Sequence, residues 1–335
     1  MTLVLMQNPC LPKYRPLSSP LKAAYLPVTS YIFLTSETCL LVYLSTKQPT
    51  CQLNENKMEN KQYTEQELQQ LHAVLYDILA EIDRVCREHN IRYFIIGGTA
   101  IGAHFFDGII PWDDDIDIGM TAGDYERFMA VAPAALRTGY TLCWPGNEPH
   151  TPFYFAKVRK DGTRFVEEVT EGLDMHHGIY VDIFPMNRVP QSKRKERWQR
   201  KTAKYLNLAF ICKDAWMLKH CGTPKTSKPY NWNWMLCFLF RLLLSCVSKK
   251  AIYNMLWRTL TRYDHGNGEY YNVIIMPRDH IAVTAIDSLD MRRFGQMDIY
   301  APSDLETYLR HHYGNITKYP PEEKRINHRP MVLQF

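Results

Sequence analysis

The sequence predicts an α+β fold, a mixed sheet with flanking helices, and three observations lead to this expectation. An amphipathic pattern with a helix cap covers residues 64–90, and short apolar runs separated by Gly and Pro follow over residues 93–184. Residues 191–262 then have the pattern of a basic, tryptophan-rich helical insertion. The chain has 335 residues, of which 46% are hydrophobic and 22% charged, so collagen, coiled coil and wholesale disorder are excluded.

Residues 1–57 differ in composition from the rest of the chain. Pro and Ser are scattered through them, and Glu37 interrupts an apolar run over residues 31–43. That run is too short and too broken for a membrane span, and no cleavage site marks a secretory signal. We interpret these residues as a poorly ordered extension or an upstream translation artefact, with Met58 as the alternative start.

The first helix is expected to begin after Thr64. Glu67 follows Thr64 by three residues, which is the spacing of a capping box. Apolar residues then recur at steps of three and four: Leu68, Leu71, Leu75, Ile78, Ile82 and Val85. Asn90 suits the end of this helix.

Short strands and helices follow along the central part of the chain. Strands are expected at residues 93–96, 115–120, 141–144, 153–159, 163–168 and 179–184, and helices near Thr99 and over residues 124–136. Gly97 and Gly98 indicate a tight turn between the first strand and the small helix. Together these elements predict a mixed sheet.

Four aspartates lie within the five positions 113–117, just before and at the start of the second predicted strand. On an extended strand Asp113, Asp115 and Asp117 project to one side, while Ile116 and Ile118 enter the core. Such a cluster repels itself unless a hard divalent cation neutralises it. Carboxylate oxygens are ligands for Mg²⁺, with Mn²⁺ as the alternative. The cluster therefore predicts a metal ion and a phosphate.

The double glycine, Gly97 and Gly98, is the candidate phosphate-binding segment. Glycines let backbone N–H groups approach a phosphate closely, and the N-terminus of the following helix favours an anion. Thr99 adds a hydroxyl donor. No G-K-[ST] follows and no G-x-G-x-x-G is present, so the segment is neither a P-loop nor a dinucleotide motif.

These residues resemble the active-site signature of a known family. The segments are GIIPWDDDIDIGM (108–120), HGIYVDIFP (177–185), Tyr313-Gly314 and PPEEKRINH (320–328). They resemble the LicD family, the LicD/fukutin group of the nucleotidyltransferase superfamily, from about Thr64 to the C-terminus. The resemblance implies a nucleotidyltransferase-like sheet and an Mg²⁺-dependent phosphotransferase. The transferred group is expected to be phosphocholine from CDP-choline, moved onto a hydroxyl of a cell-surface glycan such as lipopolysaccharide or teichoic acid, with release of CMP.

The resemblance also implies the roles of the site residues. Asp115 and Asp117 are the expected metal ligands and catalytic carboxylates. Asp182, between Val181 and Ile183, is the expected third carboxylate, on the metal side or as general base. Gly97, Gly98, Thr99 and Lys157 are expected to bind the donor.

Some residues keep two interpretations. Lys157 and Arg159 alternate on one strand, where they either meet the donor phosphates or face solvent on an edge strand. His177 is interpreted as structural. Arg325 and His328 either close over the site or form surface salt bridges.

The resemblance and the charge pattern divide the chain. We expect an extension (1–57), a catalytic core (58–190), a basic helical insertion (191–265) and the C-terminal part of the catalytic domain (266–335). Residues 191–262 contain sixteen Lys and Arg, two acids and five of the seven Trp residues. Such a block is a solvated face or binds the anionic surface of a membrane, where a lipid-linked glycan acceptor would lie. It lacks a recognisable nucleic-acid module, so no nucleic-acid partner is expected.

The nine cysteines are an odd number without a C-x-x-C pair, which is typical of reduced thiols in a cytoplasmic protein. We therefore expect a cytoplasmic location, with peripheral attachment at the inner face of the membrane as an extension of that hypothesis. Three other functions stay open: transfer of NMP to a small-molecule hydroxyl, use of CDP-ribitol or CDP-glycerol as donor, and a non-catalytic scaffold at the membrane.

Overall fold

The computed structural model describes residues 63–214, 242–276, 280–321, 325 and 327–335. The extension predicted for residues 1–57 lies outside the described residues. So do Trp216, Trp232 and Trp234 of the basic block.

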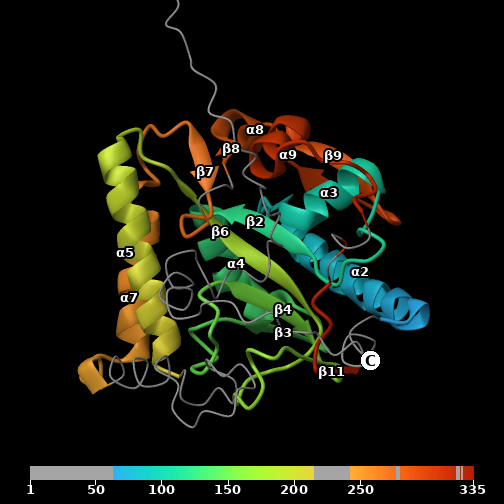
Figure 1. The fold of residues 1–335 in the computed structure, drawn as a ribbon, viewed down its shortest axis with the longest axis horizontal. Helices are drawn as coiled ribbons and strands as arrows, with labels where there is room; N and C mark the ends of the chain where they lie inside the picture. The colour runs from blue at the N-terminus through green and yellow to red at the C-terminus, as the bar shows by residue number, and fades with distance from the viewer. Residues whose placement is uncertain (1–62, 215–241, 277–279, 322–324, 326) are drawn as a thin grey trace, which may run out of the picture.

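The described part has an α+β fold, as the sequence predicts, built on a mixed seven-stranded sheet (Figure 1). Its strands are β1 (Phe94–Ile95), β2 (Asp117–Thr121), β3 (Tyr140–Cys143), β4 (Ala156–Lys160), β6 (Tyr180–Arg188), β7 (Tyr270–Asn272) and β8 (Ile281–Ala282). The order is β1-β2-β6-β4-β3, and β7 pairs with the end of β6 and with β8. The β2–β6 pair is parallel and the other pairs are antiparallel.

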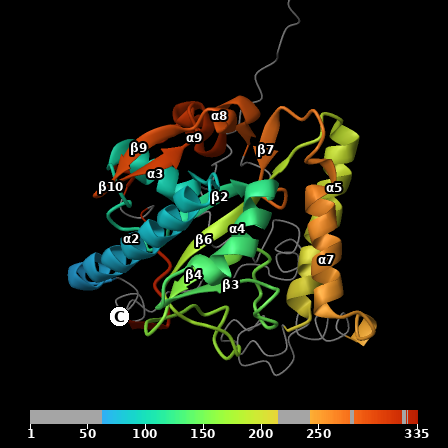
Figure 2. The same ribbon diagram turned by 180° about the vertical axis from the view of Figure 1, so that it is seen from behind.

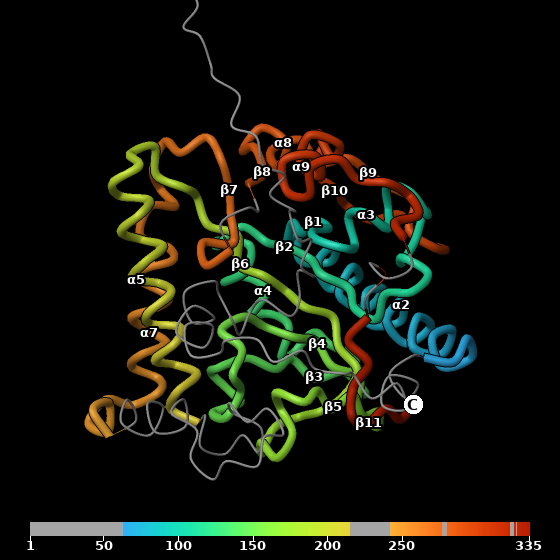
Figure 3. Tube along the Cα trace, in the orientation of Figure 1, coloured from blue at the N-terminus to red at the C-terminus, as the bar shows by residue number. Residues whose placement is uncertain are grey.

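Two small sheets lie outside this one. β9 (Asp290–Phe294) pairs with β10 (Met297–Ala301), and β5 (Arg164–Val166) pairs with β11 (Val332–Gln334). The second pairing brings the C-terminus against the middle of the chain, as the tube drawing shows (Figure 3).

Helices α2 (Glu65–Glu88) and α4 (Ala122–Ala135) cover one face of the large sheet (Figure 2). The predicted capping box is confirmed, since the Thr64 hydroxyl accepts from the Glu67 N–H and the Glu67 carboxylate accepts from the Thr64 N–H. The predicted apolar stripe is also confirmed, because Leu71, Leu75, Ile78, Ile82 and Val85 are all buried. Burial of this stripe holds α2 on the sheet.

The remaining helices lie around the sheet. They are α3 (Gly97–Phe105), α5 (Lys193–Cys212), α7 (Lys249–Leu260), the 3₁₀ helix η5 (Thr261–Tyr263), α8 (Val283–Asp287) and α9 (Leu305–Tyr313). Helices α5 and α7 lie side by side, and Gln199 on α5 donates to the carbonyls of Thr259 and Leu260 at the end of α7. None of the helices in the described part is long and apolar enough to cross a bilayer.

The exposed face of α5 is basic and aromatic. It presents Lys193, Arg194, Lys195, Arg197 and Lys201 together with Trp198 and Tyr205. The helical character of this block is confirmed over α5 and α7. Its binding to a membrane surface stays a prediction.

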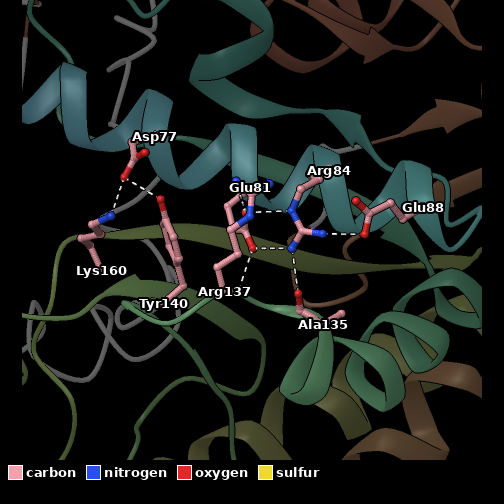
Figure 4. A network of polar contacts seen from close by, with 8 residues as sticks. All are labelled: Asp77, Glu81, Arg84, Glu88, Ala135, Arg137, Tyr140 and Lys160. Atoms are coloured by element: carbon pink, nitrogen blue, oxygen red, sulfur yellow. Dashed lines mark hydrogen bonds and ion pairs between the residues drawn. The ribbon is translucent and has the colours of Figure 1, made fainter.

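A buried carboxylate fastens α2 to the end of α4. The side chain of Glu81 is 2% exposed, and Arg84 donates to both of its oxygens at 2.6 and 3.0 Å. The backbone N–H of Arg137 donates to the same carboxylate at 2.8 Å, and Arg84 also donates to the carbonyl of Ala135 (Figure 4). These bonds satisfy the buried charge and fix the position of α2.

A second group of polar contacts lies one turn earlier on α2. Asp77 accepts from Lys160 of β4 and from the hydroxyl of Tyr140 of β3, each at 2.7 Å (Figure 4). The helix is therefore tied both to α4 and to the edge of the sheet.

Replacing Glu81 by alanine is expected to lower the free energy of unfolding by about 2–3 kcal/mol, because Arg84 and the N–H of Arg137 lose a buried partner. Glu88 is the matched control, since it pairs with the same Arg84 but is 53% exposed. Glu88→Ala should cost less than about 1 kcal/mol. Urea denaturation of the two variants measures both effects, and equal losses would contradict this account of Glu81.

Candidate active site

A row of three charged side chains crosses the middle of the large sheet. Asp117 on β2 is the register partner of Asp182 on β6, and Asp182 is the register partner of Lys157 on β4. All three residues are buried, with 3–4% of their surface exposed. Register partners point to the same face of a sheet, so these side chains lie next to one another. The structure thus brings Asp117 and Asp182 together from two separate strands.

Lys157 neutralises the third carboxylate in this structure. Its Nζ lies 2.8 Å from Oδ1 of Asp182 and against the rings of Tyr180 and Phe153, 3.4 and 4.1 Å from their centroids. Burial raises the pKa of Asp182 to about 6, although the charge of Lys157 acts in the opposite direction. Because β4 lies between β6 and β3, the edge-strand interpretation of Lys157 is wrong.

The remaining aspartates reach the site from a loop. The strand β2 begins at Asp117, two residues later than the sequence predicts, so strand alternation does not apply to Asp113 and Asp115. Burial and the charge of Asp114 raise the pKa of Asp115 to about 7. Burial, followed by the charges of Asp115 and Asp182, raises the pKa of Asp117 well above its ordinary value. The carboxylates converge as predicted, but Asp113 and Asp115 reach the site from a loop and not from the strand.

The glycine turn lies directly against this cluster. A Cβ on Gly97 would be 2.9 Å from Oδ2 of Asp117, and one on Gly98 would be 2.8 Å from Oδ2 of Asp113. Gly97 also has a φ of +59°, which favours glycine. Any larger residue would push the carboxylates away from the N-terminus of α3.

The polar groups at the start of α3 have different hydrogen-bond partners. The N–H of Gly97 donates to the hydroxyl of Tyr308, and the Thr99 hydroxyl accepts from the N–H of Asp117 at 2.7 Å. Thr99 therefore positions Asp117. In the first turn, the N–H groups of Gly98 and Thr99 have no intrahelical partner and remain suited to an anion.

The C-terminal segment of the chain contacts the acidic loop, and these contacts bear on the two interpretations of His328. Oδ2 of Asp114 accepts from the hydroxyl of Tyr63 at 2.7 Å and from the backbone N–H of His328 at 2.8 Å. Arg329 continues this contact by donating to Glu67 at 2.7 Å. The structure therefore favours the interpretation in which His328 closes over the site.

The residues present fit a divalent cation. Within the part of the chain that the structure describes, Asp114, Asp115 and His328 form a group whose ligand atoms lie within 4.8 Å of one another. Beside it, Oδ1 of Asp117 is buried without a hydrogen-bond partner. An unpaired buried carboxylate oxygen among other carboxylates is the donor chemistry that Mg²⁺ requires.

Comparisons with known proteins identify relatives of this chain. Residues 90–211 match the model of the LicD/FKTN/FKRP nucleotidyltransferase domain. The lipopolysaccharide cholinephosphotransferase LicD of Haemophilus influenzae is 25% identical over 269 residues, which cover 78% of this chain and 95% of that protein. Residues 90–211 therefore belong to the LicD family of nucleotidyltransferase domains.

Two further relatives match over shorter stretches of the chain. Uncharacterized proteins of Rickettsia typhi and Rickettsia prowazekii are 37% identical over 68 residues and 36% identical over 70 residues. The chain spans about a quarter of the length of each. The LicD domain match contains Asp117, Lys157 and Asp182, whereas His328 lies beyond it. The sequence signal for His328 is its place in the segment 320–328.

Proposed function

We propose that this LicD-family chain transfers the phosphocholine group of CDP-choline onto a hydroxyl of a cell-surface glycan and releases CMP. The observation that carries the proposal is the row of Asp117 and Asp182 on adjacent parallel strands, with Gly97 and Gly98 against the neighbouring carboxylates. This arrangement offers a cation site next to an anion-binding turn, which is what a diphosphate donor requires.

The nature of the donor and acceptor is inferred from the relative. The Haemophilus influenzae protein is named a lipopolysaccharide cholinephosphotransferase, and this chain covers 95% of its length. We therefore propose phosphocholine as the transferred group and a glycan such as lipopolysaccharide or teichoic acid as acceptor.

In the proposed site Asp115 and Asp117 would hold Mg²⁺, with Asp182 as the third carboxylate. The bound ion would neutralise charge on the diphosphate. The N–H groups of Gly98 and Thr99 orient the donor phosphates.

Asp182 accepts the proton of the acceptor hydroxyl in this proposal. The hydroxyl oxygen then bonds to phosphorus, the phosphorus–oxygen bond to CMP breaks, and CMP leaves with the electron pair. A pKa of about 6 suits this task, because the carboxylate is ionised near neutral pH and still basic enough to receive a proton. Lys157 keeps Asp182 ionised and oriented through their ion pair.

A donor screen tests the proposed reaction. The protein is incubated with Mg²⁺, a glycan acceptor and one of CDP-choline, CDP-ethanolamine, CDP-ribitol, CDP-glycerol or ATP. CMP release that is fastest with CDP-choline and stops with EDTA is the expected result. Preference for CDP-ribitol or CDP-glycerol would correct the transferred group. Pyrophosphate release from ATP would instead identify NMP transfer and contradict the proposal.

A further inference from the structure

Three aromatic side chains pack together beside the acidic loop. The ring centroids of Phe106 and Trp112 are 5.8 Å apart, those of Phe106 and Tyr319 are 5.7 Å apart, and those of Trp112 and Tyr319 are 6.5 Å apart. The three rings come from the end of α3, the acidic loop and the segment after α9. We call these three residues the aromatic wall.

Two cations of the chain already lie on the aromatic wall. The guanidinium carbon of Arg325 is 4.9 Å from the Trp112 centroid and 6.0 Å from that of Tyr319. The Nζ of Lys318 is 5.2 Å from the Phe106 centroid and 5.8 Å from that of Tyr319. Cations within about 6 Å of ring centroids are attracted by the negative faces of the rings. The wall is therefore a surface that binds positive charge.

The aromatic wall is accessible and close to the phosphate end of the candidate site. Tyr319 is 61% exposed, and Trp112 and Phe106 are partly exposed. Trp112 directly precedes Asp113, whose carboxylate lies against Gly98 at the start of α3. Trp112 therefore links the wall to the turn through the acidic loop.

We propose that the aromatic wall binds the trimethylammonium group of the choline head group, with the side chains of Arg325 and Lys318 giving up their positions on the rings. The inference rests on the proposed function and names the feature that selects its donor. A quaternary ammonium has no N–H group, so it gains little from hydrogen bonding and much from aromatic faces. A primary ammonium is compact and strongly hydrated, and a polyol needs hydrogen-bond partners that three rings do not provide. The wall therefore favours choline over ethanolamine, ribitol and glycerol.

The test compares a cationic donor with a neutral one of the same shape. Binding of CDP-choline and of the CDP ester of 3,3-dimethylbutanol, in which a tert-butyl group replaces trimethylammonium, is measured by calorimetry with Mg²⁺. CDP alone is titrated in parallel to report the nucleotide diphosphate site. The wild-type protein should bind CDP-choline about 5- to 30-fold more tightly than the neutral ester. Dividing one affinity by the other cancels any loss of affinity that a variant causes for both donors.

Matched variants test whether the aromatic wall causes this difference in affinity between the two donors. Tyr319→Leu should bring the ratio close to one, whereas Tyr319→Phe, which keeps the ring, should preserve it. Tyr205→Leu is the control, since Tyr205 is 62% exposed on α5 and lies outside the wall. The pair Trp112→Leu and Trp112→Phe repeats the comparison at the second ring.

The possible outcomes separate the two proposals. If wild type and Tyr319→Leu have the same ratio while CDP still binds, the aromatic wall proposal is overturned and the proposed function stands. Failure of the wild-type protein to bind CDP would overturn the proposed function and the wall with it. A ratio that falls in both Leu variants and persists in both Phe variants supports the wall.

Discussion

Replacing Asp117 by asparagine is expected to reduce Mg²⁺-dependent CMP release by about 10³-fold or more, while the metal-free protein becomes more stable. The carboxylate is buried, one of its oxygens has no hydrogen-bond partner, and burial raises its pKa well above the ordinary value. In the proposed site Asp117 would hold Mg²⁺, so its loss would remove several kcal/mol of charge stabilisation, and each 1.36 kcal/mol corresponds to tenfold in rate. The same change removes a buried carboxylate beside other carboxylates, which is worth on the order of 1–3 kcal/mol of stability.

The opposite signs of the two effects identify the role of Asp117. CMP release and urea denaturation in EDTA are measured for Asp117→Asn and for Asp298→Asn. Asp298 is the control because its side chain is 61% exposed and lies 3.9 Å from Arg293 in a surface pair. The control should change neither quantity appreciably. A variant at Asp117 that loses activity and stability together would indicate a structural carboxylate instead.

The two strands that carry Asp117 and Asp182 could be predicted from the local sequence, whereas their proximity was expected only from the family resemblance. Asp117 and Asp182 each stand beside apolar residues in a short run, which is a local signal for a buried strand carrying an acid. Their register pairing depends on the parallel contact between β2 and β6. A parallel pair joins segments far apart in the chain, so no local turn signal encodes its register.

The loop before β2 could not be predicted from alternation, because distant side chains determine its path. Nε2 of His72 lies 2.8 Å from the carbonyl oxygen of Asp113, and Tyr63 and His328 hold the carboxylate of Asp114. These contacts join the loop to the start of the described chain and to its end. The strand pattern gave a role to Asp113, Asp115 and Asp117 but none to Asp114, and so did not indicate its contact with His328.

The pairing of Lys157 with Asp182 also follows from register alone. The sequence indicates that Lys157 lies on a strand but not which strand is its neighbour. Since β4 is an inner strand, its lysine is buried and takes a carboxylate partner. The ion pair is thus a consequence of sheet order.

Replacing Lys157 by methionine is expected to destabilise the metal-free protein by about 2–3 kcal/mol near pH 8, because Asp182 loses its buried counter-charge. Lys160→Met is the matched control on the same strand. Lys160 pairs with Asp77 at 2.7 Å, but these side chains are 29% and 49% exposed, so about 1 kcal/mol or less should be lost.

The loss in Lys157→Met should depend on pH in a direction set by Asp182. The folded-state pKa of Asp182 is about 6, above the ordinary 3.8, and removal of Lys157 raises it further. A raised folded pKa gives stability that is present below the unfolded pKa and is lost as pH rises through the folded pKa. The difference between wild type and Lys157→Met should therefore be small near pH 4 and grow from about pH 6 to pH 8, by at most about 1.4 kcal/mol per pH unit. Adding Asp182→Asn to Lys157→Met should restore at least about 2 kcal/mol at pH 8, since no unpaired carboxylate remains. Urea denaturation in EDTA across this pH range measures all three proteins, and a difference that stays constant with pH would show that Lys157 contributes packing rather than charge.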